Sequence, residues 1–402
     1  MERGVVHVTG LGCVSPLGAG VPALVAALAA GEGRIRPLPL PPGAGRGACL
    51  AGAAADFGEM ARRYLPPGLR RKMARFSLLA AAAAGEALES AGLEPGAGAR
   101  TGVALATAFG STGRSDEFFQ DFLREGPRHV NPGLFPETVP NAPAGQCALA
   151  FGLLGPNLAL CRLSLSSELA LAAALDLLAA GAADRVLVLG VEELAPALLA
   201  GLAAAGVLKR PEEAAGDGVR LSGRTLPGEA AAALVLERGE ALRGRGGRSL
   251  AVIEQVEALG GGLRAPRFHR VEAAAGAVLD RLLAGSPPPA VVAAGTFVAA
   301  ADRGLASALA RRLPGQTPVA VPEYATGHLF GAGLLRVLVA VLALGGAEVP
   351  ARVLEALPPD PAPPGGDRIL AAGGPGGGVL VLAASAGGGA AGVRLGPGEG
   401  GA

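Results

Sequence analysis

The sequence has almost no net charge and few cysteines, and both shortages exclude classes of function. Its 35 lysines and arginines balance 34 aspartates and glutamates, which leaves a formal net charge of +1 and no basic field for binding nucleic acid. The four cysteines, Cys13, Cys49, Cys147 and Cys161, lack the paired spacing of a metal site. We therefore expect reduced, mostly buried thiols and no metal or other cofactor.

The longest apolar helical segments are broken by charge, although the mean hydropathy of +0.42 is high. Glu168 and Asp176 bracket one such segment, and Arg336 divides another. A membrane-spanning helix needs about 20 consecutive apolar residues, so we expect no membrane association. No charged leader with an apolar core opens the sequence, which favours a cytoplasmic location.

The composition that remains is typical of a large globular core. The 402 residues are 50% hydrophobic and 17% charged. Residues 387–402 are rich in glycine and alanine and have few large apolar anchors. We therefore predict a flexible tail over 387–402.

The most informative stretch is 155–168, which reads GPNLALCRLSLSSE. An apolar run ends there in a short polar turn, and helix-forming alanines and leucines follow, which predicts strand, tight turn and helix. A side chain in such a turn lies over the helix N-terminus, where unpaired N–H groups lower the pKa of a thiol. The residue present is Ser164, and a hydroxyl gains far less from that position.

Several motifs, in this order and spacing, resemble the β-ketoacyl synthases of type II fatty-acid and polyketide assembly. The resemblance covers about residues 5–382, and its motifs lie at 8–18, 71–76, 141–145, 155–168, 227–237 and 326–333. It implies an α/β, thiolase-like fold in which two duplicated βαβ-type halves form α-β-α-β-α layers. We expect the halves at 1–240, with the nucleophile turn, and 241–386.

In this family a cysteine carries the acyl chain, and the resemblance places Ser164 at that position. Cys161 lies three residues earlier, where strand alternation sends its side chain to the opposite face. We interpret Cys161 as a core residue and Ser164 as a vestigial site, with an acylated Ser164 as the alternative.

In this family two histidines support decarboxylation of the malonyl donor, and a lysine organises the site. The resemblance places Ala294 where the first histidine is usual and retains the second as His328, which is either vestigial and structural or a base. Glu323 stands where the lysine is usual. A carboxylate there would repel the carboxylate of a malonyl donor.

The turn that supplies one oxyanion N–H in the family matches 374–377, and its second residue is Pro375. Proline has no N–H, and losing one oxyanion donor costs about 2.7–4 kcal/mol of transition-state stabilisation. Four altered positions together argue against condensation. The pattern resembles chain-length-factor subunits, although these usually carry glutamine where Ser164 stands.

We therefore predict a catalytically silent, chain-length-factor-type subunit that pairs with an active ketosynthase and shapes the acyl tunnel. Its heterodimer would use acyl carrier protein in type II polyketide, polyene or fatty-acid-like assembly. The alternative is an acyltransferase or thioester hydrolase in which His328 activates Ser164. A third hypothesis is a self-sufficient condensing enzyme.

Two surfaces are candidates for partner contacts. The resemblance implies a dimer interface around 158–163 and 132–144, with one patch used by both partners. Within it, Leu134, Phe135 and Thr138 either reach the partner's tunnel or pack in the interface. The basic residues Arg70, Arg71, Lys72 and Arg75 either dock the carrier protein or form a solvated face.

Overall fold

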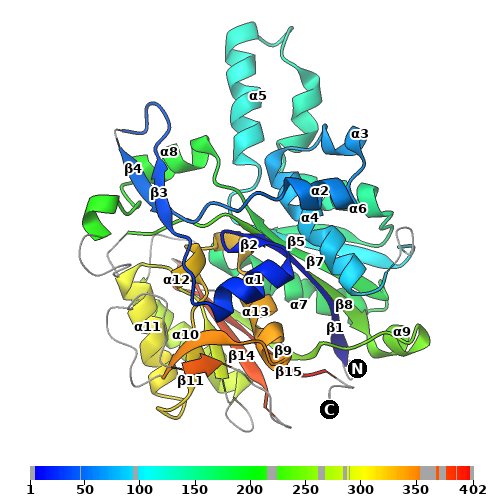
Figure 1. The fold of residues 1–402 in the computed structure, drawn as a ribbon, viewed down its shortest axis with the longest axis vertical. Helices are drawn as coiled ribbons and strands as arrows, with labels where there is room; N and C mark the ends of the chain where they lie inside the picture. Colours follow the sequence, from blue (N-terminus) through cyan, green and yellow to red (C-terminus); the bar gives the residue numbers. More distant parts are fainter. Residues whose placement is uncertain are drawn as a thin grey trace.

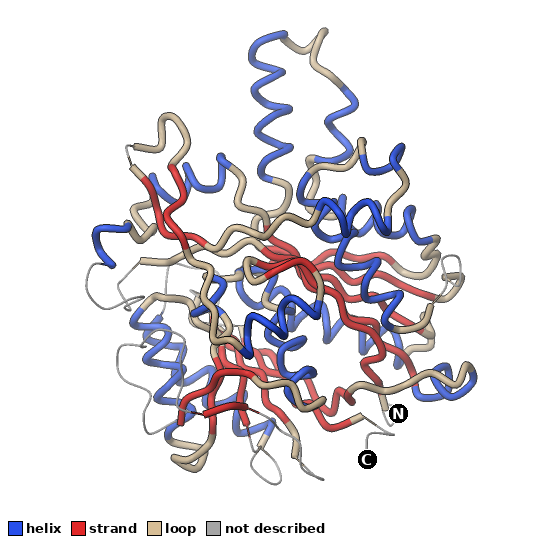
Figure 2. The backbone as a smooth tube through the Cα atoms, viewed as in Figure 1, coloured by secondary structure: helices blue, strands red, loops and turns tan. Residues whose placement is uncertain are grey.

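The structure, a computed structural model, consists of one long mixed sheet with helices on both faces and between its halves (Figures 1 and 2). It describes residues 5–45, 47–93, 98–214, 224–260, 268–283, 288, 290–353, 368–370, 377–385 and 387–398.

The sheet is built from two sets of five strands with the same topology. The first set comprises β1 (Val6–Ser15), β5 (Thr101–Thr107), β6 (Asn157–Cys161), β7 (Arg185–Glu192) and β8 (Ala230–Arg238). The second comprises β9 (Ala251–Leu259), β10 (Ala290–Ala293), β11 (Pro318–Ala320), β14 (Val379–Ala384) and β15 (Ala390–Pro397).

The spatial order is β6-β5-β7-β8-β1 in the first half and β11-β10-β14-β15-β9 in the second. Parallel and antiparallel pairs occur at the same places in both. The halves meet where β1 pairs with β9, from Val6–Ile253 to Val8–Ala251. The predicted α/β thiolase-like fold of two duplicated halves is confirmed.

Helices form three layers around the two half-sheets. One outer layer, α4 (Arg75–Ser90) and α6 (Ala142–Phe151), covers the first half. The other, α10 (Val271–Leu282) and α11 (Ala299–Ala310), lies on the second half. The central helices α7 (Ser166–Ala179) and α13 (Leu334–Leu344) contact strands of both halves.

Small residues allow these layers to approach closely. The six residues 79–84 of α4 are fully buried, and five of them are alanines. A Cβ at Gly12 of β1 would collide with the Ala83 carbonyl and the Ala87 nitrogen. The alanine- and glycine-rich sequence therefore packs the helix tightly against the strand.

The remaining elements are shorter or peripheral. They are β2 (Gly18–Ala19), α1 (Val21–Ala29), β3 (Arg36–Pro39), β4 (Ala48–Ala51), α2 (Gly58–Tyr64), α3 (Pro67–Arg70), α5 (Thr112–Glu125), η1 (Pro132–Glu137), η2 (Leu163–Leu165), α8 (Pro196–Ala204), η3 (Pro211–Ala214), α9 (Gly239–Gly244), η4 (Phe268–Arg270), α12 (Glu323–Thr326), η5 (Phe330–Ala332), β12 (Val349–Val353) and β13 (Arg368–Leu370). The helix α5 projects from the body at the top of Figure 1, and none of its residues is buried.

The predicted flexible tail over 387–402 is wrong for its central part. Residues Ala390–Pro397 form β15, which pairs with β14 on one side and β9 on the other. Small residues are needed there because a Cβ at Gly392 would lie 2.6 Å from Leu282 and 2.9 Å from the Val381 carbonyl. A glycine-rich segment can therefore be a central strand when a helix crosses it closely.

The part of the chain that the structure describes contains no helix long and apolar enough to cross a membrane.

Candidate functional site

Ser164 lies in the turn between β6 and the central helix α7, as the sequence predicts. The turn is η2, and its first residue, Leu163, has a left-handed backbone with φ of 51°. The Ser166 hydroxyl fixes the turn, because it accepts from the Arg162 N–H at 2.6 Å and contacts the Thr107 carbonyl at 2.8 Å. The Ser164 side chain is consequently held at the N-terminal end of α7 and is buried.

His328 occupies the matching place in the second half, just before η5 and α13. Its N–H donates to the Leu226 carbonyl at 2.6 Å, and its carbonyl accepts from Gly228 at 2.8 Å. These bonds bring the ring to Ser164, whose Oγ lies 3.0 Å from His328 Nε2. Ser164 and the retained His328, the two catalytic candidates, are therefore in hydrogen-bond contact.

A chain of hydroxyls sets the tautomer of His328. Thr225 Oγ1 donates to the Thr296 carbonyl at 3.1 Å and lies 3.2 Å from His328 Nδ1. The Thr225 hydroxyl has one proton and donates it to the Thr296 carbonyl. We therefore assign the hydrogen of the imidazole to Nδ1, which donates to the Thr225 oxygen. Nε2 is then unprotonated and accepts the Ser164 hydroxyl proton. Thr225 was missed in the sequence because it lies 103 residues from His328.

The surroundings of His328 keep it neutral. Burial and, to a smaller extent, the nearby Arg336 cation lower the pKa of His328 to about 3. The Phe330 ring lies 4.0 Å from the imidazole, centroid to centroid. In the described part of the chain, the ring's hydrogen bonds go to two hydroxyls and not to a carboxylate. Nε2 can accept a hydrogen bond from Ser164, but uptake of a proton by the imidazole is disfavoured.

Glu323, predicted to repel the carboxylate of a malonyl donor, has a buried cationic partner. Arg336 on α13 donates to Glu323 at 2.6 Å and to Glu168 on α7 at 2.9 Å. All three side chains are almost completely buried. Arg336 therefore opposes the repulsion expected of Glu323, and sequence spacing did not place this arginine beside it.

Ala294 lies at the end of β10, and the turn after it is held by Asp302. The Asp302 carboxylate accepts from the Thr296 N–H at 2.9 Å, the Thr296 hydroxyl at 2.6 Å and the Phe297 N–H at 2.9 Å. Burial raises the pKa of Asp302 to about 6. Ala294 is buried and supplies no acid, base or hydrogen-bonding side chain. Asp302 therefore holds the turn after β10, and no described side chain there can take the role of the family's first histidine at position 294.

Sequence comparison decides the family. The family model described as "Beta-ketoacyl synthase, N-terminal domain" matches residues 4–241, which is more than half of the chain. The chain belongs to the β-ketoacyl synthase family. It is similar to 3-oxoacyl-[acyl-carrier-protein] synthase 2 of Vibrio cholerae, with 29% identity over 372 residues, covering 87% of this chain and 88% of the relative.

Solved structures share the β-ketoacyl synthase fold along almost the whole chain. A β-ketoacyl synthase from Burkholderia phymatum has a TM-score of 0.83 and 24% identity, covering 98% of this chain and 99% of that one. The ishigamide ketosynthase/chain length factor has a TM-score of 0.82 and 22% identity, covering 98% of this chain and 100% of that one. These likenesses extend the family fold beyond the matched N-terminal region.

Two further residues of the sequence prediction are Pro375 and Cys161. Pro375 lies outside the described residues. Cys161, predicted in the core, is instead exposed. The reason is that β6 forms the edge of the described sheet, so Cys161 pairs with Thr107 of β5 on one side and no described strand covers its other side.

The predicted interface residues lie on the projecting lobe formed by α5 and η1. Leu134 is partly buried, Phe135 is exposed, and the Thr138 hydroxyl donates to the Phe135 carbonyl at 2.8 Å. Thr138 also lines a cavity of about 540 Å³ between α5 and α8, with Phe109 at its wall. Phe109 packs edge-on against Phe330 at 5.1 Å, so the cavity adjoins the His328 ring stack.

The predicted basic cluster is only partly available for a partner. Arg71 and Lys72 are exposed and Arg70 is partly buried, whereas Arg75 donates twice to the buried Glu229, at 2.8 and 2.7 Å. Docking by Arg70, Arg71, Lys72 and the half-exposed Arg75 stays a prediction.

A buried carboxyl under the site escaped sequence analysis. Glu192, the last residue of β7, accepts from the N–H groups of Ala108 at 2.8 Å, Phe109 at 3.2 Å and Gly331 at 3.2 Å. Desolvation nevertheless dominates and raises the pKa of Glu192 to about 8. The carboxyl ties the end of β5 to the turn η5 that follows His328.

Proposed function

We propose that this protein is a catalytically silent, chain-length-factor-type subunit of the β-ketoacyl synthase family. It works beside an active ketosynthase in type II assembly of a polyketide, polyene or fatty-acid-like chain on acyl carrier protein. The observation that carries the proposal is the environment of the one retained histidine, His328. Its ring is buried and neutral, and within the described residues the ring nitrogens bond only to hydroxyls.

General bases work best when their pKa is close to the operating pH. A histidine with a pKa of about 3 takes up a proton reluctantly at neutral pH. Its partner Ser164 is a weak nucleophile unless a base removes its proton. With Ala294 at the other histidine position and Glu323 bound to Arg336, the residues around Ser164 support packing rather than condensation.

The edge of the sheet supports pairing with a related chain. The edge strand β6 has two exposed leucines beside it, Leu149 at 70% and Leu154 at 77% exposure, and Leu163 follows it in the nucleophile turn. A strand edge flanked by apolar side chains favours association through a new strand pair. Association there would place the partner next to the turn that holds Ser164.

The cavity between α5 and α8 supports a role in the acyl tunnel. It has Phe109 at its wall, next to the His328 stack, and Thr138 of the lobe lines it as well. The hydroxyls of Ser111 and Thr112, which also line it, have no hydrogen-bond partner among the described residues. Such groups favour a guest that offers acceptor oxygens.

The test is reconstitution with a ketosynthase that carries an intact cysteine. We expect a stable one-to-one complex and unchanged product formation in Ser164→Ala, whereas alanine at the partner's cysteine abolishes the product. As a second variant, Phe109→Ala enlarges the cavity and shifts the length of the product. Loss of turnover in Ser164→Ala would overturn the silent role.

The 3.0 Å contact between Ser164 Oγ and His328 Nε2 favours one second candidate, an acyltransferase or thioester hydrolase. In it, the Ser164 oxygen attacks a thioester carbonyl, His328 takes the hydroxyl proton, and the thiol leaves with that proton. Mass spectrometry after incubation with an acyl thioester tests this directly. An adduct present in the natural protein and absent in Ser164→Ala supports it, and no adduct on either excludes it.

A further inference from the structure

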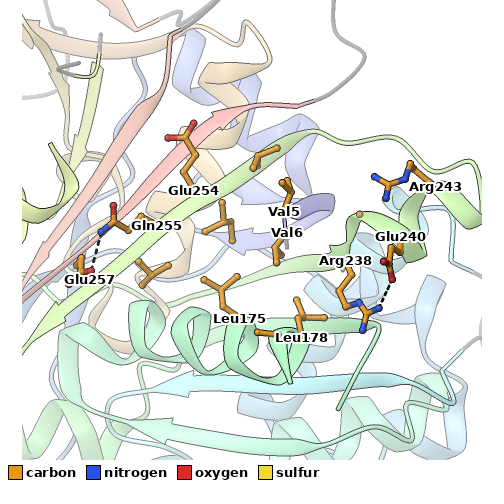
Figure 3. A pocket seen from close by; sticks show the side chains of 15 residues that line it. Val5, Val6, Leu175, Leu178, Arg238, Glu240, Arg243, Glu254, Gln255 and Glu257 are labelled. Carbon is orange, nitrogen blue, oxygen red and sulfur yellow. Dashed lines mark hydrogen bonds and ion pairs between the residues drawn. The ribbon is translucent and has the colours of Figure 1, made fainter. Parts of the chain in front are cut away.

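A second large cavity lies at the opposite end of α7 from Ser164. Its volume is about 710 Å³, and its lining comes from β1, α7, β9 and the segment from the end of β8 into α9 (Figure 3). The helix α7 spans Ser166–Ala179, about 20 Å at 1.5 Å per residue. The cavity is therefore separate from the Ser164 site.

The topology explains why the cavity exists. The strand β1 starts at Val6, which pairs with Ile253, whereas β9 continues to Leu259. On the other side, β8 ends at Arg238 and the chain turns into α9. The cavity therefore lies between β9 and α9, and the last turns of α7 form its floor, at the bottom of the view in Figure 3.

The floor of the cavity is apolar and firmly packed. Leu175 and Leu178 of α7 and Ile253 of β9 are buried, and Val6 and Val256 are among the other apolar residues of the lining. Six of the fifteen lining residues are polar or charged. A cavity that joins an apolar floor to charged walls suits an amphipathic small molecule. A hydrocarbon segment is the guest that such a floor accommodates.

At the rim of the cavity every carboxylate has an arginine partner, but one arginine has no carboxylate partner among the described residues. The three carboxylates of the rim are paired with arginines: Glu240 with Arg238 at 2.7 Å, Glu254 with Arg394 at 2.8 Å and Glu257 with Arg281 at 3.0 Å. Arg243 on α9 forms no ion pair within the described residues, and Figure 3 shows its guanidinium turned toward the cavity. A free guanidinium next to an apolar floor matches an anionic head group on an apolar body.

We propose that this cavity binds a long-chain carboxylate, with the carboxylate at Arg243 and the hydrocarbon over Leu175, Leu178 and Ile253. The site is independent of Ser164 and of any partner subunit.

Titration calorimetry of decanoate into the full-length protein tests the proposal. We expect saturable one-site binding of decanoate, and much weaker binding of decanol and of decyltrimethylammonium, which lack the anionic group. Arg243→Glu should weaken decanoate binding at least about tenfold, because a charge-assisted bond becomes a repulsion. The matched control is Arg248→Glu, since Arg248 is an exposed arginine outside the lining.

Two further variants locate the ligand. Ala179→Trp fills the cavity from an exposed helix position and should abolish binding, whereas Ala180→Trp, next to it and outside the lining, should not. Gly201→Phe fills the other cavity, where a Cβ meets no atom within 4 Å, and should leave binding unchanged. Equal binding of decanol, unaltered binding in Arg243→Glu or Ala179→Trp, or loss in Gly201→Phe would each overturn the proposal.

Discussion

The two halves of the sheet share a strand order but finish it differently. In the second half, β12 and β13 continue the sheet beyond β11, whereas β6 in the first half stays at the edge. The strand β7 ends in the buried Glu192, and its counterpart β14 ends in Ala384. The duplicated scaffold thus diverged at the edge and at the strand ends around the site, and it stayed alike in the core.

The largest expected effect tests whether the second half is closed by its last strand. Deleting residues 387–402 removes β15, which lies between β14 and β9. We expect loss of cooperative folding, measured by circular dichroism during heating, because two strand ladders are lost at once. A shorter deletion that ends the chain at Gly398 keeps β15 and serves as the control. A cooperative transition in the longer deletion would restore the tail interpretation.

The junction between the halves is tested next. Arg336→Leu leaves Glu168 and Glu323 buried without their cation, and we expect a loss of about 3–5 kcal/mol in the free energy of unfolding. Urea denaturation measures it. Arg312→Leu breaks an exposed pair with Asp280 and should cost no more than about 1 kcal/mol. Equal effects of the two variants would contradict a structural role for the buried network.

The equivalent turns before α7 and α13 give a matched pair of substitutions. Leu163 and Phe330 both have left-handed backbones, with φ of 51° and 43°, but Leu163 is 40% exposed and Phe330 is 8% exposed. Glycine relieves strain at both positions. Leu163→Gly should change stability by less than about 1 kcal/mol, whereas Phe330→Gly should cost about 3 kcal/mol because the ring packs on Phe109 and His328. Urea denaturation measures the free energy of unfolding of both variants. Equal losses in the two would show that the turns contribute equally to stability.

The last effect concerns pH and the end of β7. Burial raises the pKa of Glu192 from its usual 4.5 to about 8. Between pH 4.5 and pH 8 the folded protein therefore keeps a proton on Glu192, whereas the unfolded chain has lost it. Stability therefore falls as pH rises from about 5 to 8, by about 3–4 kcal/mol for this group. Glu192→Gln should flatten the profile measured by urea denaturation, and Glu240→Gln, at an exposed rim, should not. Parallel profiles for all three proteins would refute the shift.

Local patterns in the sequence predicted much of the site. The strand, turn and helix around Ser164 were readable because apolar alternation and helix-forming residues are local signals. Thr225 and Arg336 were not readable, because each meets its partners through tertiary packing of distant segments. The burial of Cys161 was misjudged because alternation gives the face of a strand and not its place in the sheet.

The open edge of β6 has a consequence for how the protein is supplied in the cell. A lone copy presents an unpaired strand with Leu149 and Leu154 beside it, which is a template for other chains, including its own. Copies made in excess of a partner would compete for that edge and aggregate. Under the proposed function, this edge would therefore require that the chain and its partner be made in balanced amounts.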